Sequence, residues 1–342
     1  MKMKVISSRM CKCPYCMEEH EVKTVLVNDG TIFNGVKVEC VCEYEYCEND
    51  DCFYADERQF AENNQRLKDA YRKKMGLLTS KDISGIRAKY GISQADLSLL
   101  LGWGGKTITR YESCQVQDKA HDSILKKLDE DPGWYISLLD NTKAEFTEKA
   151  YRRYLAYATK LYEKKQEDYL RKSIEAAYAP YLGNSEDHGN AELALNKVVD
   201  VIRYFASSRE ITSLYTVKLM KLLWYADALS YKRHGHAITG LVYQALPMGA
   251  VPVAYSSIIN LKGVPREEVE ISEATANKYF LESKASSSQL SKEDIAVLDD
   301  VISALGKMSK QEIVSFMHEE KAYTQTKPMG VISFKYAEFL QI

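Results

Sequence analysis

The sequence predicts a mainly α-helical protein of several domains, with a small β-rich module at its N-terminus. Three observations support this prediction. The chain has 342 residues, more than one ordinary domain needs. Seven of its eight cysteines lie before residue 53, in a segment where polar and apolar residues alternate. Most of the remaining chain has apolar residues at intervals of three and four, which is typical of amphipathic helices.

These patterns divide the chain into four segments. We expect a zinc-binding β-rich module (1–60), a helical connector with a helix-turn-helix (61–140), a helical linker (141–189) and a mostly helical domain (190–342). With 46 basic and 48 acidic residues, the chain has no overall bias toward nucleic acid, so a DNA-binding surface must be a local patch. It lacks the apolar run of a signal peptide or a membrane span, and we expect a cytoplasmic protein.

The N-terminal cysteines predict one structural zinc site. Thiols stay reduced in the cytoplasm, so clustered cysteines indicate a metal site before they indicate disulfides. Cys13 and Cys16 form a C-x2-C knuckle, in which a tight turn lets two thiolates bind one ion. Cys47 and Cys52 are expected to supply the second pair. We do not expect the other three cysteines of this segment to bind the ion: Cys11, Cys40 and Cys42. Cys40 or Cys42 is the candidate to replace Cys52 as the fourth ligand.

Between the two cysteine pairs, the sequence predicts strands and hairpins. Turn signals stand at residues 28–30 and 34–35, flanked by β-branched residues. We expect Cys40 and Cys42 to point to opposite faces of a strand and therefore to share a metal poorly. Residues 1–60 carry 7 basic and 12 acidic side chains, which argues against DNA binding by this module. The alternatives are ordinary buried cysteines or a catalytic zinc, but no HExxH signature is present.

Residues 81–128 are predicted to form three short helices. Ser93 followed by Asp96 is a capping signal for the second helix. A glycine-rich turn then leads to a third helix over residues 106–112, which should bury Ile108. Two short helices joined by such a turn are typical of the DNA-binding helix-turn-helix, whose second helix enters the major groove. This segment has 8 basic and 5 acidic residues, a charge opposite to that of the zinc module.

The residues "SQADLSLLLGW" and "KTITRYES" in this segment resemble the Xre/Cro family of helix-turn-helix domains. In that family the Gln that opens the second helix and the early residues of the third helix contact DNA. The resemblance implies this role for Gln94, Gly105, Lys106, Thr109 and Arg110. Glycines precede Lys106 where the family usually has Ser-Arg, so we expect base specificity from Lys106 and Thr109. Because Xre domains bind palindromes as dimers, we expect a homodimer on a palindromic operator.

A zinc module, a helical connector and an Xre-like domain together resemble MqsA-type antitoxins, over about residues 10–140. The zinc of that family is structural, which agrees with the absence of a catalytic signature here. The family's second knuckle is normally C-x2-C, whereas four residues separate Cys47 from Cys52 in this chain.

Residues 142–178 contain no glycine or proline and carry a stripe of tyrosines at helical spacing. They predict one long helix. It is either a solvated linking helix, or its tyrosine stripe packs on another domain or subunit.

The last segment resembles the Panacea domain, also called SocA-like, over about residues 192–340. The resemblance is carried by "KLMKLLWYA" and "GLVYQALPMGAVP". It implies a domain that binds and neutralises a protein toxin. We expect the partner surface to include the exposed side of the first of these stretches and the loop of the second, with the candidates Lys221, Tyr225, Tyr243 and Met248.

No catalytic residues are predicted, and we expect the protein not to be an enzyme. The histidines of the last domain lack ligand spacing and an activated nucleophile. The function expected from the whole chain is therefore that of an antitoxin which neutralises a toxin through its C-terminal domain and represses its own operon. The alternative is a stand-alone zinc-containing Xre-family regulator, whose C-terminal domain senses a ligand or protein.

Overall fold

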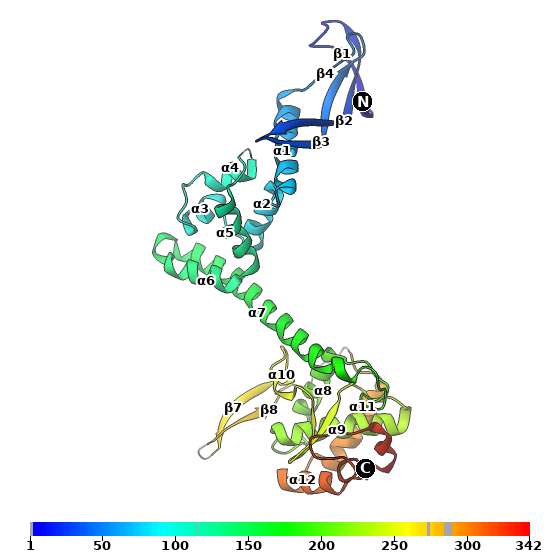
Figure 1. Cartoon of the computed structure of the whole chain (residues 1–342). Coiled ribbons are helices and arrows are strands. Elements are labelled where there is room, and N and C mark those ends of the chain that lie inside the picture. Colours follow the sequence, from blue (N-terminus) through cyan, green and yellow to red (C-terminus); the bar gives the residue numbers. More distant parts are fainter. Residues whose placement is uncertain (1–2, 114, 272–273, 284–288) are drawn as a thin grey trace. The chain divides into compact units, whose positions relative to one another are not determined.

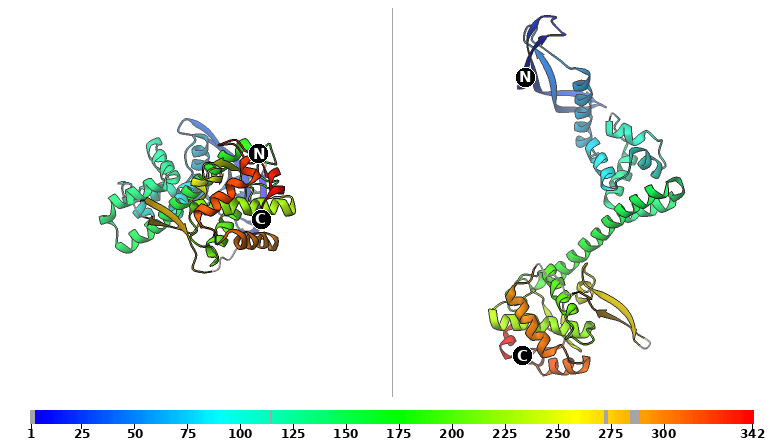
Figure 2. Two further views of the ribbon diagram at one scale, coloured as in Figure 1. Left: turned by 90° about the horizontal axis from the view of Figure 1, so that it is seen from below. Right: turned by 180° about the vertical axis from the view of Figure 1, so that it is seen from behind.

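The computed structural model describes most of the chain (Figure 1), namely residues 3–113, 115–271, 274–283 and 289–342. The chain divides into two compact units, Met1–Lys164 and Lys165–Ile342, whose elements can be followed in two further views (Figure 2). A small antiparallel sheet begins the chain and helices form most of the rest, which confirms the predicted fold class. Among the described residues, no helix combines the length and apolar character that a membrane span requires.

Four antiparallel strands form the N-terminal sheet in sequence order: β1 (Met3–Lys12), β2 (Glu19–Phe33), β3 (Val36–Cys47) and β4 (Cys52–Tyr54). The expected turn at Asn34–Gly35 joins β2 to β3, and its residues have the positive φ values, 48° and 75°, of a two-residue hairpin. The prediction of a turn at residues 28–30 is wrong. Strand β2 continues through them, and Gly30 pairs with Glu39 of β3, because pairing along the whole strand outweighs the local turn preference.

Helix α1 (Glu57–Lys74) follows the sheet and packs against β3. Asp56 begins it through a capping box, in which its carboxylate accepts a hydrogen bond from the backbone N–H of Gln59 (2.6 Å). Near the other end, the buried Arg72 donates to the carbonyl oxygen of Tyr111 (2.8 Å). The connector is therefore joined by hydrogen bonds to the helices that follow it.

The next helices share one apolar core: α2 (Ser80–Lys89), α3 (Gln94–Leu100), α4 (Thr107–Ser113), α5 (Lys119–Glu130) and α6 (Pro132–Asn141). The short η1 (Lys143–Glu145) follows α6 and is exposed. Ser93 caps α3 as expected, accepting a hydrogen bond from the backbone N–H of Asp96 (3.1 Å). Ile108 is fully buried, also as expected. The rings of Tyr90 and Tyr135 stack with centroids 3.9 Å apart at the centre of this core.

Helix α7 (Glu148–Tyr178) is the expected long helix. Tyr154 and Ala158 are buried in the core of α2–α6, whereas Ile174 and Tyr178 are buried in the core of the C-terminal unit. Other tyrosines of the stripe are exposed. The stripe is thus partly packed against a neighbouring domain of the same chain, the second of the two interpretations.

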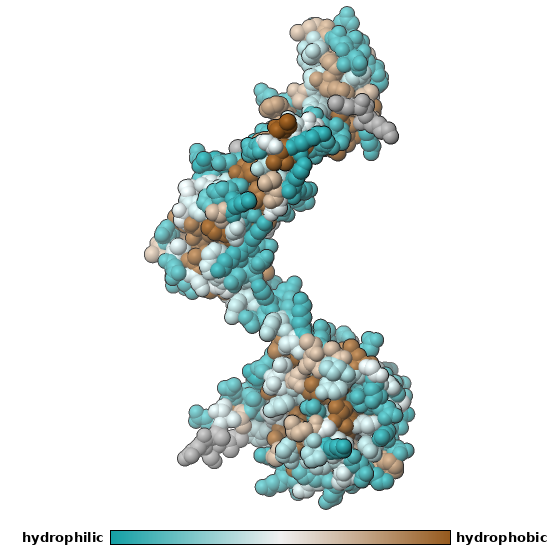
Figure 3. Space-filling model, in the orientation of Figure 1, coloured by the Kyte–Doolittle hydropathy of each residue, from teal (hydrophilic) through white to brown (hydrophobic). Residues whose placement is uncertain are grey.

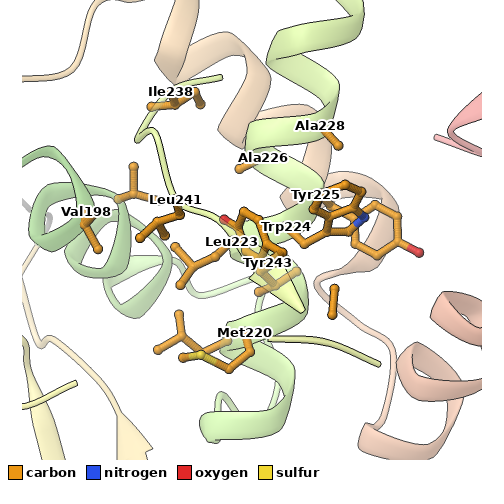
Figure 4. Close-up of a cluster of buried hydrophobic side chains, with 14 of the residues drawn as sticks. Val198, Met220, Leu223, Trp224, Tyr225, Ala226, Ala228, Ile238, Leu241 and Tyr243 are labelled. Atoms are coloured by element: carbon orange, nitrogen blue, oxygen red, sulfur yellow. The ribbon is translucent and has the colours of Figure 1, made fainter. Parts of the chain in front are cut away.

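The C-terminal unit is built around α9 (Thr216–His234), whose side chains pack in the apolar core shown in Figure 4. Gly235 ends this helix in the left-handed conformation (φ 77°). Its helical neighbours are η2 (Ala179–Tyr181), α8 (Leu195–Ser207), α10 (Tyr255–Ile258), α11 (Lys292–Leu305), α12 (Lys310–Glu319), α13 (Lys321–Thr324) and η3 (Phe334–Phe339). Two hairpins complete it: β5 (Tyr243–Leu246) with β6 (Gly249–Pro252), and β7 (Arg266–Ile271) with β8 (Ala274–Tyr279). Hydrophilic side chains cover most of the visible surface (Figure 3).

Candidate functional site

Four potential metal ligands converge at one end of the N-terminal sheet. Cys13 and Cys16 lie between β1 and β2, His20 lies at the start of β2, and Cys47 ends β3. Their ligand atoms all lie within 4.8 Å of one another. Cys13 and Cys47 are fully buried, as a closed structural site requires. Three thiols and one imidazole in this arrangement are a donor set that fits a tetrahedral zinc ion.

Local hydrogen bonds orient the ring of His20 and favour the metal-binding form of Cys13. When Nδ1 of His20 carries the ring proton, it donates to the carbonyl oxygen of Glu21 at 2.9 Å. Nε2, which lies 3.5 Å from Sγ of Cys47, then keeps its lone pair for a metal. Burial raises the pKa of the Cys13 thiol, but hydrogen bonds from the backbone of the knuckle outweigh it, and the pKa falls to about 6. The thiolate is the form that binds metal.

Three of the four ligands predicted from the sequence, Cys13, Cys16 and Cys47, are in this group, and Cys52 is not. Cys52 faces Cys47 across the β3–β4 pair and packs beside the group. His20 occupies the fourth position instead. The sequence analysis did not identify His20 as a ligand. The signal that could have identified it is its position only four residues after Cys16, close enough for both side chains to bind the same ion.

The spare cysteines stay outside the group as well. Cys11 faces His20 across β1–β2. The Sγ atoms of Cys40 and Cys42 are 3.4 Å apart, which corrects the expectation that they point to opposite faces, because residues two apart on a strand share a face. Cys47 lies five positions beyond Cys42 on β3, roughly 16 Å at about 3.3 Å per residue. Neither reserve ligand can therefore reach the group.

A second candidate site is the surface formed by α3 and α4. The predicted DNA contacts Gly105, Lys106, Thr109 and Arg110 are exposed, and Gln94 is half-buried. The apolar side of α4 faces the core. Lys106 and Arg110 form no ion pair with any residue that the structure describes, so both cations are available to a ligand on this face.

Hydrogen bonds hold Gln94 between the two helices. Its Nε2 donates to Oε2 of Glu112 (2.6 Å), and its Oε1 accepts from the hydroxyl of Thr109 (2.9 Å). Arg87 of α2 forms an ion pair with the same Glu112 (2.8 Å). The side chains of Gln94 and Thr109 are therefore oriented together, with support from three helices.

In the C-terminal domain, three of the four candidate partner residues are buried. Lys221, Tyr225 and Tyr243 have no exposed surface, whereas Met248 is 39% exposed. This corrects the expectation that one side of the helix faces solvent. Helix α9 contacts α8, α11, α12, β6 and η3, so the core surrounds it, and a protein partner cannot touch these three side chains in this structure.

A buried carboxylate fixes the loop that follows α9. Oδ1 of Asp227 accepts from the backbone N–H groups of Ile238 (2.9 Å) and Thr239 (2.8 Å). Its Oδ2 accepts from the hydroxyls of Thr239 (2.5 Å) and Tyr243 (2.7 Å). Burial raises the pKa of Asp227 to about 6 despite these hydrogen bonds. Tyr243 therefore has a structural role, which the sequence did not reveal.

Comparison with known proteins identifies one part of the chain. Residues 219–323, from α9 to α13, match the family model described as antitoxin SocA-like, Panacea domain. The C-terminal unit thus carries an antitoxin-like domain, as the resemblance noted in the sequence implied. No curated protein and no solved structure matches the chain.

Proposed function

We propose that this protein is an antitoxin that neutralises a cognate protein toxin through its C-terminal domain and represses its own operon by binding DNA. The match of residues 219–323 to the SocA-like Panacea family carries the first part of this proposal. Because α9 is enclosed by the core, we place the toxin surface on exposed parts of the domain. The turn of the β5–β6 hairpin, with the exposed Met248, is one of them.

The DNA-binding part is supported by the exposed polar face of α3 and α4. We place α4 in the major groove, where Lys106 and Thr109 contact base edges while Gln94 and Arg110 contact the phosphate backbone. A homodimer would present two such faces to a palindromic operator. The hydrogen bonds between Gln94, Thr109 and Glu112 support this role because they orient the polar side chains before DNA binds.

The proposed role of zinc is structural. In the described part of the N-terminal module, the apolar cluster beside the cysteines has Cys13, Val22 and Cys47 as its buried members, and the sheet buries four more small apolar side chains: Val25, Val27, Val38 and Cys42. Such a small core cannot fold a domain by itself, whereas a bound zinc ion supplies folding free energy directly. Here Cys13, Cys16, His20 and Cys47 would hold the ion.

The toxin can be found and tested with the full-length protein. Purification of the tagged protein from its native cells should bring a small partner with it, and expression of that partner alone should stop growth. Co-expression of the full-length protein should restore growth. If no toxic partner exists and the protein still represses its promoter, the stand-alone regulator is the better interpretation.

Fragments then locate the neutralising activity. A fragment of residues 165–342 keeps Ile174 and Tyr178, which belong to the C-terminal core. It should restore growth, and residues 1–164 should not. Growth restored by the N-terminal fragment alone would place neutralisation in the zinc module and contradict the proposal.

A further inference from the structure

The C-terminal unit carries a mainly apolar cavity that the proposed function does not use. Its volume is about 510 Å³, within the range of small-molecule sites. It lies where the end of α7 and η2 meet the segment that leads into α8 and the loop that follows α9. All of its lining residues belong to one compact unit, so the cavity is formed within a single domain.

Packing and hydrogen bonds fix the floor and one wall of this cavity. Tyr178 and Val242 form the floor and are almost fully buried, and the hydroxyl of Tyr178 donates to the carbonyl oxygen of Val253 (3.0 Å). On the wall, Nδ1 of His188 lies 2.9 Å from the carbonyl oxygen of Ala191 and donates to it when it carries the ring proton. The cavity is therefore formed before a ligand binds, as is usual for small-molecule sites.

Apolar side chains around this floor remain accessible to a ligand. Leu182 is 71% exposed, and Tyr181 and Leu193 are half-buried. A ligand that covers them removes apolar surface from water, which is the dominant favourable contribution at such sites. Tyr181 also offers an aromatic ring on which a second ring can stack. The apolar part of the ligand is therefore expected to be aromatic.

The polar groups of the lining indicate the charge of the ligand. Glu175 and Glu192 line the cavity and are exposed, and neither side chain forms an ion pair with any residue that the structure describes. Ionised carboxylates only accept hydrogen bonds, and Nε2 of His188 is a further acceptor when Nδ1 carries the proton. None of the described lining residues is a lysine or an arginine. Apolar surface beside two unpaired carboxylates favours a ligand that combines an apolar body with a positive charge.

We infer that this cavity binds a small apolar amine of the arylalkylamine class. The aromatic body of the amine covers Tyr181, Leu182 and Leu193. Its ammonium group lies at the exposed rim, where it donates to Glu175 and Glu192. An ammonium group has three donors and no acceptor, which matches a lining that offers acceptors. The inference does not depend on the antitoxin role.

Calorimetric titration of the full-length protein with tryptamine tests the inference. Wild-type protein should bind tryptamine more tightly than indole-3-propionate, which has the same ring system and a carboxylate in place of the ammonium group. The double variant Glu175→Gln/Glu192→Gln should bind tryptamine roughly tenfold more weakly, because each exposed ion pair contributes up to about fivefold in affinity. Both side chains are exposed, so the variant should keep its fold. The control Glu268→Gln/Glu270→Gln changes two exposed carboxylates of β7, outside the cavity, and should bind like wild type.

Two variants of Tyr181 test the aromatic contact. Tyr181→Leu should weaken the binding of tryptamine roughly two- to tenfold, whereas Tyr181→Phe keeps the ring and should bind like wild type. Failure of wild-type protein to bind tryptamine at millimolar concentration would overturn the inference, and so would equal affinities for tryptamine and indole-3-propionate or equal affinities of the two double variants. Binding of the peptide acetyl-Leu-Lys-Leu-amide in place of tryptamine, with the same glutamate dependence, would also overturn it and assign the cavity to a basic protein segment.

Discussion

Gly240 is the most informative single position for testing the packing of the C-terminal domain. It lies in the loop after α9 with a φ of +72°, and a Cβ atom built there would lie 2.3 Å from the carbonyl oxygen of Glu192 and 2.7 Å from that of Ala191. Both neighbours are backbone atoms and cannot rotate away. We therefore predict that Gly240→Ala strongly destabilises this unit.

The expected loss of unfolding free energy in Gly240→Ala has two parts. An alanine in the left-handed conformation costs about 1 kcal/mol relative to glycine. Relieving the overlap with the backbone requires a local shift, which costs about 1–3 kcal/mol in a packed site. The total is about 2–4 kcal/mol. Gly235→Ala is the matched control because its φ is +77° and its Cβ would meet nothing within 4 Å. It should cost only the first part, about 1 kcal/mol.

The assay is urea unfolding followed by the fluorescence of Trp224, which is fully buried. In a fragment of residues 165–342 it is the sole tryptophan. The slope of the transition should stay constant while the midpoint falls more for Gly240→Ala than for Gly235→Ala. In thermal unfolding, each kcal/mol should correspond to roughly 2–4 °C. Equal losses for the two variants would refute the steric argument, since both share the same backbone strain.

Three other predictions concern the remaining sites. His20→Ala should lose the bound zinc while Cys52→Ser keeps it, as measured by metal content per chain; the opposite result would restore the ligand set expected from the sequence. Arg110→Ala should weaken operator binding in a gel-shift assay and make it less dependent on salt, with Arg152→Ala, on α7, as the unaffected control. The folded-state pKa of Asp227, about 6, lies above the unfolded value of 3.8, so the folded state binds the proton more tightly. This group's contribution to stability should therefore fall by up to about 3 kcal/mol as the pH rises from about 4 to about 6, and Asp227→Asn should abolish that fall in pH-dependent urea unfolding.

The zinc module shows how far spacing alone can predict a metal site. The knuckle of Cys13 and Cys16 is recognisable because both ligands lie in one turn, whose geometry depends on adjacent residues. The remaining ligands come from separate strands. Whether His20 or Cys52 completes the group depends on the register of β2 and β3 and on which side chains face inward, and the ligand spacing does not contain this information.

The helical part of the N-terminal unit was easier to anticipate. The cap at Ser93 and the burial of Ile108 follow from short-range patterns, since a cap satisfies N–H groups within its own turn and an apolar stripe must face a core. The network that joins Gln94 to Thr109 and Glu112 could not be anticipated. Its members are brought together by the packing of α3 against α4.

The sequence by itself determined the features whose causes lie within a few residues: the Asn34–Gly35 hairpin, the zinc knuckle, and the cap that begins α3. Only the tertiary structure decided which side of α9 is covered. Lys221 and Tyr225 lie on a helix that has polar groups in its sequence, yet α8, α11, α12, β6 and η3 pack around it and leave both side chains buried. Burial is a property of the surroundings of a residue, and the elements that surround α9 come from segments far away in the chain.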